Sequence, residues 1–79
     1  MKTLHDPLYL EIIARLRSAR ERRGYSQAGL ATRLGKPQSF IAKIETGERR
    51  IDFLETLTIC GVLETPLGTI IPASFKHLL

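Results

Sequence analysis

Two short helical patterns joined by a tight turn occupy residues 25–45 of this 79-residue chain. The first opens at Ser26, whose hydroxyl can accept a hydrogen bond from the backbone N–H groups of the following turn. Apolar residues then recur at helical spacing, at Leu30, Ala31 and Leu34. Gly35 supplies the backbone freedom to leave the helix. The pattern therefore predicts a helix from about Gln27 to Leu34, ended by a glycine turn.

A second helix is predicted directly after this turn. Pro37 fixes the φ angle from which a helix can start without losing an interior N–H, so the helix begins near Pro37 or Gln38. Its apolar stripe packs inward and its polar side faces outward. The stripe consists of Phe40, Ile41 and Ile44, and the opposite side of Gln38, Ser39, Ala42 and Lys43. Two short helices with one tight turn are the layout of a DNA-binding helix-turn-helix.

Size and charge agree with such a unit. A chain of 79 residues, 43% hydrophobic, is expected to form one small domain over residues 1–79. Its formal net charge is +4, but residues 15–50 alone hold ten Lys or Arg against three Glu, which makes that segment +7 and the remainder −3. The positive segment coincides with the helix-turn-helix and its flanks, where a phosphate backbone would lie.

The flanking sequence predicts three further helices and no strands. Asp6-Pro7 opens a long amphipathic helix that runs to Gly24. Its outer face carries four arginines, most of them expected to be solvated, with contact to a phosphate near the C-terminal end of the helix as the alternative: Arg15, Arg17, Arg22 and Arg23. A basic loop over 46–50 follows the second motif helix. Asp52 caps a fourth helix that ends near Leu63, and Thr65-Pro66 opens a short fifth helix stopped before Pro72. The tail, residues 73–79, is apolar enough that it either folds back or is covered by a partner.

Over Leu16 to Ile71, the order of these elements resembles the Cro/C1-type helix-turn-helix family, also called the XRE family, of bacterial and phage transcription regulators. The resemblance implies an all-α fold, a compact five-helix lambda-repressor-like domain with a core over about 7–71. It is carried by an ordered set of residues: Leu16, Arg17, Arg20, Gly24, Ser26, Gln27, Leu30, Ala31, Leu34, Gly35, Gln38, Ser39, Phe40, Ile41, Ile44, Glu45, Gly47, Glu48, Arg49 and Asp52. Departures from the family pattern are Pro37 in place of a Ser or Thr cap, Gly29 in place of a polar residue, and Gly61 within the fourth helix.

The resemblance also implies roles for individual side chains. The second motif helix would lie in the major groove, so Gln38, Ser39 and Lys43 are expected to read bases. Phosphate contacts are expected from Gln27, which lies in the first turn of the leading helix, and from Lys36, Arg49 and Arg50. Arg20 is expected to pair with Glu45 in a structural role.

These roles imply a DNA-binding transcriptional regulator, more specifically a repressor or autoregulator. We expect a homodimer on a palindromic, inverted-repeat operator, with half-sites about 10 bp apart. Dimer contacts are expected from residues that lack an obvious core role: Ile70, Ile71, Phe75, Leu78 and Leu79. The alternative is a protein-binding module of the same fold, such as an antitoxin or antiactivator, and the apolar tail keeps a protein partner open.

Other classes of protein are not supported by the residues present. His5, His77 and the lone Cys60 do not form a ligand set with zinc-like spacing, so neither a metal nor another cofactor is expected. No phosphate-cradling glycine loop or acid–base pair suggests an enzyme. No stretch approaches the roughly 20 apolar residues of a membrane span, and there is no signal-peptide pattern. We expect a cytoplasmic protein.

Overall fold

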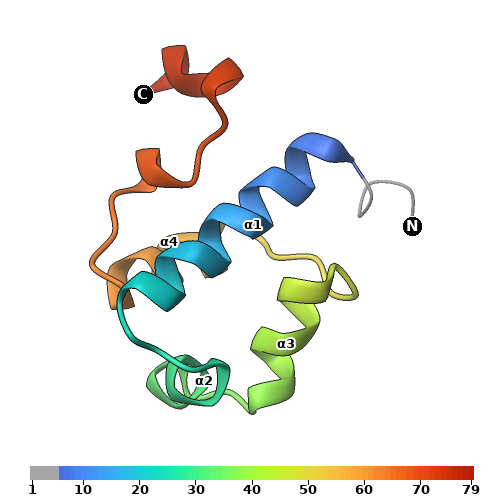
Figure 1. Ribbon diagram of the computed structural model, residues 1–79, viewed down its shortest axis with the longest axis vertical. Coiled ribbons are helices and arrows are strands. Elements are labelled where there is room, and N and C mark those ends of the chain that lie inside the picture. The colour runs from blue at the N-terminus through green and yellow to red at the C-terminus, as the bar shows by residue number, and fades with distance from the viewer. Residues whose placement is uncertain (1–5) are drawn as a thin grey trace.

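The computed structural model describes residues 6–79, and the regular secondary structure in that range consists of helices joined by short loops, with no strand. Figure 1 shows the helices folded around a common interior, with the C-terminal segment at one end of the molecule. The elements are α1 (Pro7–Arg22), α2 (Gln27–Leu34), α3 (Gln38–Thr46), α4 (Phe53–Val62) and two short 3-10 helices, η2 (Leu67–Thr69) and η3 (Ala73–Leu78). The predicted all-α fold is confirmed.

The helix ends follow from the capping residues in the sequence. The Asp6 carboxylate accepts from the Leu8 N–H at 2.8 Å, and the Ser26 hydroxyl accepts from the Gly29 N–H at 2.9 Å. Gly35 leaves α2 in the left-handed conformation with φ 70°. Pro37 precedes α3 without any side-chain cap hydrogen bond, as its side chain has no acceptor.

Gly29 has a local explanation in the cap of α2. A Cβ added there would lie 3.1 Å from the Ser26 hydroxyl oxygen and 3.7 Å from a ring carbon of Tyr25. The glycine therefore lets the capping hydroxyl approach the helix closely. Nothing in the structure explains Gly61, where an added Cβ would meet no atom within 4 Å.

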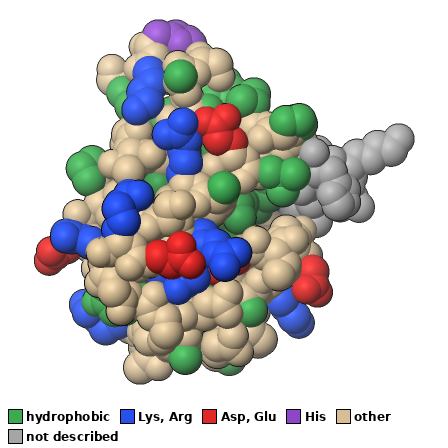
Figure 2. All heavy atoms as spheres, viewed as in Figure 1, with side chains coloured by type: hydrophobic (Ala, Val, Ile, Leu, Met, Phe, Trp, Pro, Cys, Tyr) green, Lys and Arg blue, Asp and Glu red, His purple; other side chains and the backbone are tan. Residues whose placement is uncertain are grey.

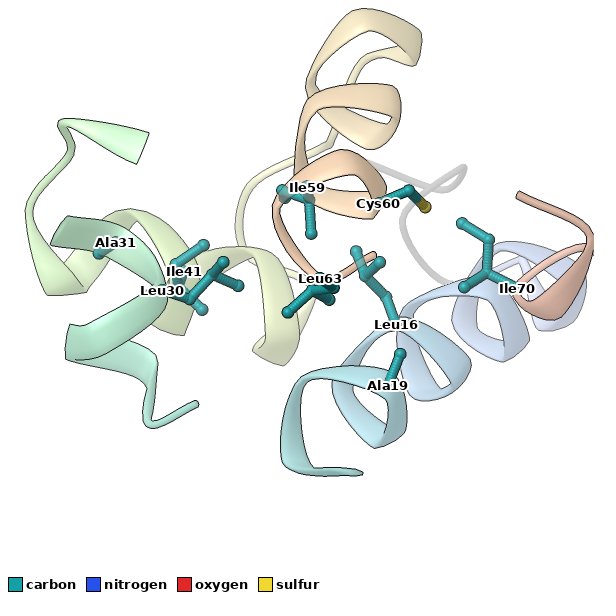
Figure 3. Close-up of a cluster of buried hydrophobic side chains, with 9 residues drawn as sticks. All are labelled: Leu16, Ala19, Leu30, Ala31, Ile41, Ile59, Cys60, Leu63 and Ile70. Carbon is teal, nitrogen blue, oxygen red and sulfur yellow. The ribbon is translucent and has the colours of Figure 1, made fainter. Parts of the chain in front are cut away.

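The core draws side chains from all four α-helices, and Figure 3 shows them converging on one interior. Cys60 is one of them, and burial raises the pKa of its thiol. It is a small residue of the core. The buried cluster comprises Leu16, Ala19, Leu30, Ala31, Ile41, Ile59, Cys60, Leu63 and Ile70.

After α4 the chain turns at Glu64, whose φ is 50°, and the short fifth helix is a 3-10 helix of three residues. The expectation that Ile70 lacks a core role is wrong, because its side chain is fully buried in the cluster. Ile71 is half-buried, and Phe75, Leu78 and Leu79 remain exposed. The tail contacts η2, where the Lys76 ammonium donates a hydrogen bond to the Gly68 carbonyl at 2.7 Å.

Arg23 has a structural role that the sequence did not predict. Its Nε donates to the Leu63 carbonyl at 2.6 Å, and its Nη2 donates to the backbone carbonyl and the carboxylate of Glu64 at 3.1 and 3.2 Å. These carbonyls close the C-terminal end of α4, so Arg23 ties the end of α1 to the end of α4. Arg23 is therefore not merely a solvated side chain, because it also links two helices.

Candidate nucleic-acid interface

The start of α3 presents polar side chains to solvent. Gln38 and Ser39 form its first turn and are exposed, and Lys43 is exposed one turn further along. Phe40, Ile41 and Ile44 point to the interior, where Ile41 and Ile44 are fully buried. The structure thus places the three residues expected to read bases together on the outer side of one helix.

The two motif helices are joined by a hydrogen bond between glutamines. Gln38 Nε2 donates to Gln27 Oε1 at 2.8 Å, and Gln27 Nε2 donates to Glu45 Oε1 at 2.9 Å. A side-chain amide carries two N–H donors and one carbonyl oxygen. One N–H of Gln38 is therefore committed to Gln27, which orients its amide while leaving the carbonyl oxygen and the second N–H for another partner.

Glu45 is itself held by a buried arginine. Arg20 Nε and Nη2 donate to the two Glu45 carboxylate oxygens at 2.7 and 3.0 Å, and Arg20 Nη1 donates to the Tyr25 carbonyl at 2.7 Å. The two side chains are only 8% and 6% exposed. The structure thus brings together the expected Arg20 and Glu45 pair. Continuous hydrogen bonds connect α1 through Glu45 and Gln27 to the exposed start of α3.

The cations expected to contact phosphates differ in their surroundings. Lys36 is exposed and lies 5.4 Å from the centre of the Phe40 ring. Arg50 is exposed and lies over the Tyr9 ring at 5.4 Å. Arg49 is bound within the protein, because its Nη1 and Nη2 donate to the two oxygens of Glu55 at 3.0 and 2.9 Å.

The Arg49 and Glu55 pair affects the charge states of both groups. The hydrogen bond to Glu55 raises the pKa of the Arg49 guanidinium, and the same bond lowers the pKa of the Glu55 carboxyl. Figure 2 shows several basic side chains next to acidic ones on the face in view. The positive charge counted along the sequence is therefore partly neutralised within the protein.

Sequence reasoning missed Glu55 as a partner of this surface. A readable signal was present, because Asp52 followed three residues later by Glu55 is the pattern of a capping box. The structure has that box: Asp52 accepts from the Glu55 N–H at 2.7 Å, and Glu55 accepts from the Asp52 N–H at 3.1 Å. The additional bond to Arg49 crosses the loop and has no local sequence signature.

A sequence profile of the helix-turn-helix family matches residues 16–70, which include α2, α3, α4 and the buried ion pair. The chain belongs to the Cro/C1-type helix-turn-helix family. This family comprises DNA-binding regulatory domains. The match covers well over half of the chain, and the predicted family is confirmed.

Among solved structures, this helix-turn-helix chain is similar to a chain in the crystal structure of apo-HppE, with a TM-score of 0.72 and 28% sequence identity. The match covers 81% of the present chain but 36% of that chain, so the helix-turn-helix unit spans about a third of the other chain's length. No curated protein matches the sequence.

The described residues of this family member hold neither a metal-ligand cluster nor a membrane-spanning helix. Within residues 6–79, no three His, Cys, Asp or Glu side chains gather where they could hold a metal ion. No helix in that range is long and apolar enough to cross a bilayer. His5 lies outside the described residues, and His77 lies in η3.

Proposed function

We propose that the protein is a sequence-specific transcriptional regulator that reads an operator in double-stranded DNA through the outer side of α3. The observation that carries this proposal is the amide of Gln38, exposed at the start of α3 and oriented by Gln27. Its free N–H and carbonyl oxygen match the N7 acceptor and N6 donor of adenine. Ser39 and Lys43 lie beside it, and a lysine can reach guanine O6 and N7.

Phosphate contacts around this helix position the protein without reading sequence. Gln27 retains one amide N–H beyond its bond to Glu45, and it lies at the N-terminal end of α2, where the helix dipole favours an anion. Lys36 and Arg50 are exposed on either side of α3 in the sequence. We assign phosphate contacts to these three residues. Arg49 differs from them, because Glu55 already pairs with its guanidinium.

A homodimer on an inverted repeat, acting as a repressor or autoregulator, is the proposed form. Ile71, Phe75, Leu78 and Leu79 supply half-buried or exposed apolar surface for a two-fold contact. A standard interface takes about 800 Å² from each partner. Deletion of residues 73–79 is expected to give monomers by light scattering and to weaken operator binding. A truncated protein that remains dimeric would contradict this interface.

The first experiment is selection of bound sequences from a random duplex pool at two salt concentrations. Recovery of an inverted repeat with half-sites about 10 bp apart supports the proposal. Retention that vanishes at physiological salt with no enriched sequence contradicts it. Lys43→Ala is then expected to relax preference at one base position by about 1–3 kcal/mol, whereas Arg17→Ala, which removes the same charge from α1, leaves that preference unchanged.

A second candidate function is a protein-binding module of the same fold, such as an antitoxin or antiactivator. The observation that favours it is an exposed apolar strip on α4, formed by Phe53, Leu54 and Leu57, in addition to the apolar tail. Apolar patches of this kind are often interaction sites. A stable complex formed through this strip by a protein that shows no operator selection would favour this candidate.

A further inference from the structure

Arg49 lies at a junction between α3 and α4. Its backbone N–H donates to the Lys43 carbonyl at 3.0 Å, across the left-handed Gly47 that ends α3. Its guanidinium lies 4.6 Å from the centre of the Phe40 ring and forks onto Glu55 of α4. Main chain and side chain of one residue therefore bridge the end of the candidate recognition helix and the start of the next helix.

Most of the hydrogen-bonding capacity of this guanidinium is used inside the protein. Nη1 donates to Glu55 Oε1 and to the Arg50 carbonyl, and Nη2 donates to Glu55 Oε2. Three of the five N–H donors of the arginine are thus occupied. The carboxylate also cancels its charge, and charge is the property that attracts phosphate and releases counterions.

The surroundings of Glu55 hold its carboxylate in the orientation that pairs with Arg49. Its Oε1 accepts both from Arg49 and from the Asp52 N–H of the capping box, so the carboxylate is oriented by the start of α4 as well as by its partner. Like other glutamates Glu55 is ionised at neutral pH, and the hydrogen bond to Arg49, which lowers the pKa of Glu55, extends the charged state to more acidic solution. The Arg49 side chain is nevertheless 39% exposed, so a phosphate could reach it if the carboxylate lost its charge.

We infer that Glu55 withholds Arg49 from the DNA backbone and that Arg49 is a positioning residue for α3 rather than a phosphate ligand. The inference rests on the proposed DNA binding. It reverses the phosphate-binding role that the sequence suggested for Arg49. It also makes Glu55 a residue that sets the ratio of the affinity for operator DNA to the affinity for random DNA. A charge that binds every phosphate equally adds affinity without adding sequence information.

The test measures binding of the intact protein to operator and random duplexes across a salt series. The salt slope is the slope of the logarithm of the binding constant against the logarithm of the salt concentration. Arg49→Gln is expected to leave this slope unchanged on random DNA. It is expected to reduce the preference for operator DNA, because α3 loses its link to α4. Glu55→Gln retains a side-chain oxygen for the capping box but removes the charge. It is expected to steepen the slope by about one and to raise affinity for random DNA about fivefold to tenfold at low salt.

Glu48→Gln is the matched control, since it makes the same charge change on an exposed residue next to Arg49, and the Glu48 carboxylate accepts from the Thr46 hydroxyl instead of from Arg49. Its salt slope is expected to stay at the wild-type value. The double variant Arg49→Gln with Glu55→Gln is expected to lose the gain in random binding. Circular dichroism establishes that each variant is folded.

Several results would overturn the inference. A slope reduced by about one in Arg49→Gln would show that the arginine already contacts phosphate. An unchanged salt slope in Glu55→Gln would show that Glu55 does not keep Arg49 from phosphate. An equal change of slope in Glu48→Gln would show that the effect is not specific to Glu55. Failure of the wild-type protein to bind any duplex at low salt would instead overturn the proposed function itself, and this inference with it.

Discussion

Two arginine–glutamate pairs flank α3, and they share their chemistry but not their surroundings. The inner pair, Arg20 with Glu45, is 8% and 6% exposed, whereas the outer pair, Arg49 with Glu55, is 39% and 23% exposed. Both pairs are forked, with two nitrogens on two carboxylate oxygens. Burial is therefore the main difference between them.

Burial changes what each pair can do. A buried charge without its partner is costly, so the inner pair is a structural element whose members cannot be lost singly. A partly exposed pair contributes little stability, because water screens its charges and solvates either member when the other is lost. The inner pair therefore holds α3 in place, whereas the outer pair is accessible enough to tune the positive charge that α3 and its loop present to solvent.

The largest expected effect is that of Glu45→Ala. The substitution leaves the buried Arg20 guanidinium with its hydrogen bond to the Tyr25 carbonyl and with the exposed Glu21 carboxylate 3.9 Å away, so it is expected to cost about 3–5 kcal/mol of unfolding free energy. Urea denaturation measures the loss. The helix-turn-helix is then destabilised as a whole, and DNA binding falls both because of unfolding and because Gln27 loses its hydrogen bond to Glu45.

Glu48→Ala is the control for this prediction, because Glu48 is exposed near the same end of α3. Its unfolding free energy is expected to stay within about 0.5 kcal/mol of the wild type. A Glu45→Ala variant that lost less than about 1 kcal/mol would remove the distinction between the two pairs.

Replacing each arginine by lysine tests whether burial distinguishes the two pairs. Arg20→Lys keeps the charge but loses the fork onto Glu45 and the bond to the Tyr25 carbonyl, and is expected to cost about 2 kcal/mol. Arg49→Lys is expected to cost less than about 0.5 kcal/mol, because water replaces the lost bonds of a partly exposed side chain. Thermal unfolding of the two variants side by side provides the measurement. Equal losses would mean that burial does not separate the pairs.

The elements of the fold were predictable because their signals are local. Ser26 and Gly35 bound α2 where their capping chemistry predicts, and Pro37 is followed directly by α3. The same reasoning places Ser39 and Lys43, four residues apart, outside the apolar stripe, whereas their expected role in reading bases came from the family resemblance. Spacing within one helix determines which residues share a face.

Contacts between elements were not predictable in the same way. Arg23 meets carbonyls that lie 40 and 41 residues further along the chain, and Arg49 reaches Glu55 across a loop whose path the sequence does not specify. Ile70 lies in a segment too short to show a helical period, so its burial depends on the route by which the chain returns to the core. The roles of these residues depend on tertiary placement, which periodicity does not report.

The smallest expected effect is the pH dependence of the outer pair. Because the folded-state pKa of Glu55 is lowered, its contribution to stability is present above the unfolded carboxyl value of about 4.3 and is lost as the pH falls through the lower folded value. The difference in unfolding free energy between wild type and Glu55→Gln is therefore expected to be at most about 1 kcal/mol at pH 7 and to shrink towards zero at about pH 3. Thermal melts of both proteins at the two pH values test this, since the other carboxylates titrate in both and cancel in the difference.

Glu48→Gln is expected to show no such pH-dependent difference. A Glu55→Gln difference that stays constant with pH would mean that the stability change comes from packing or the helix cap, and that the ionised pair contributes nothing to the fold.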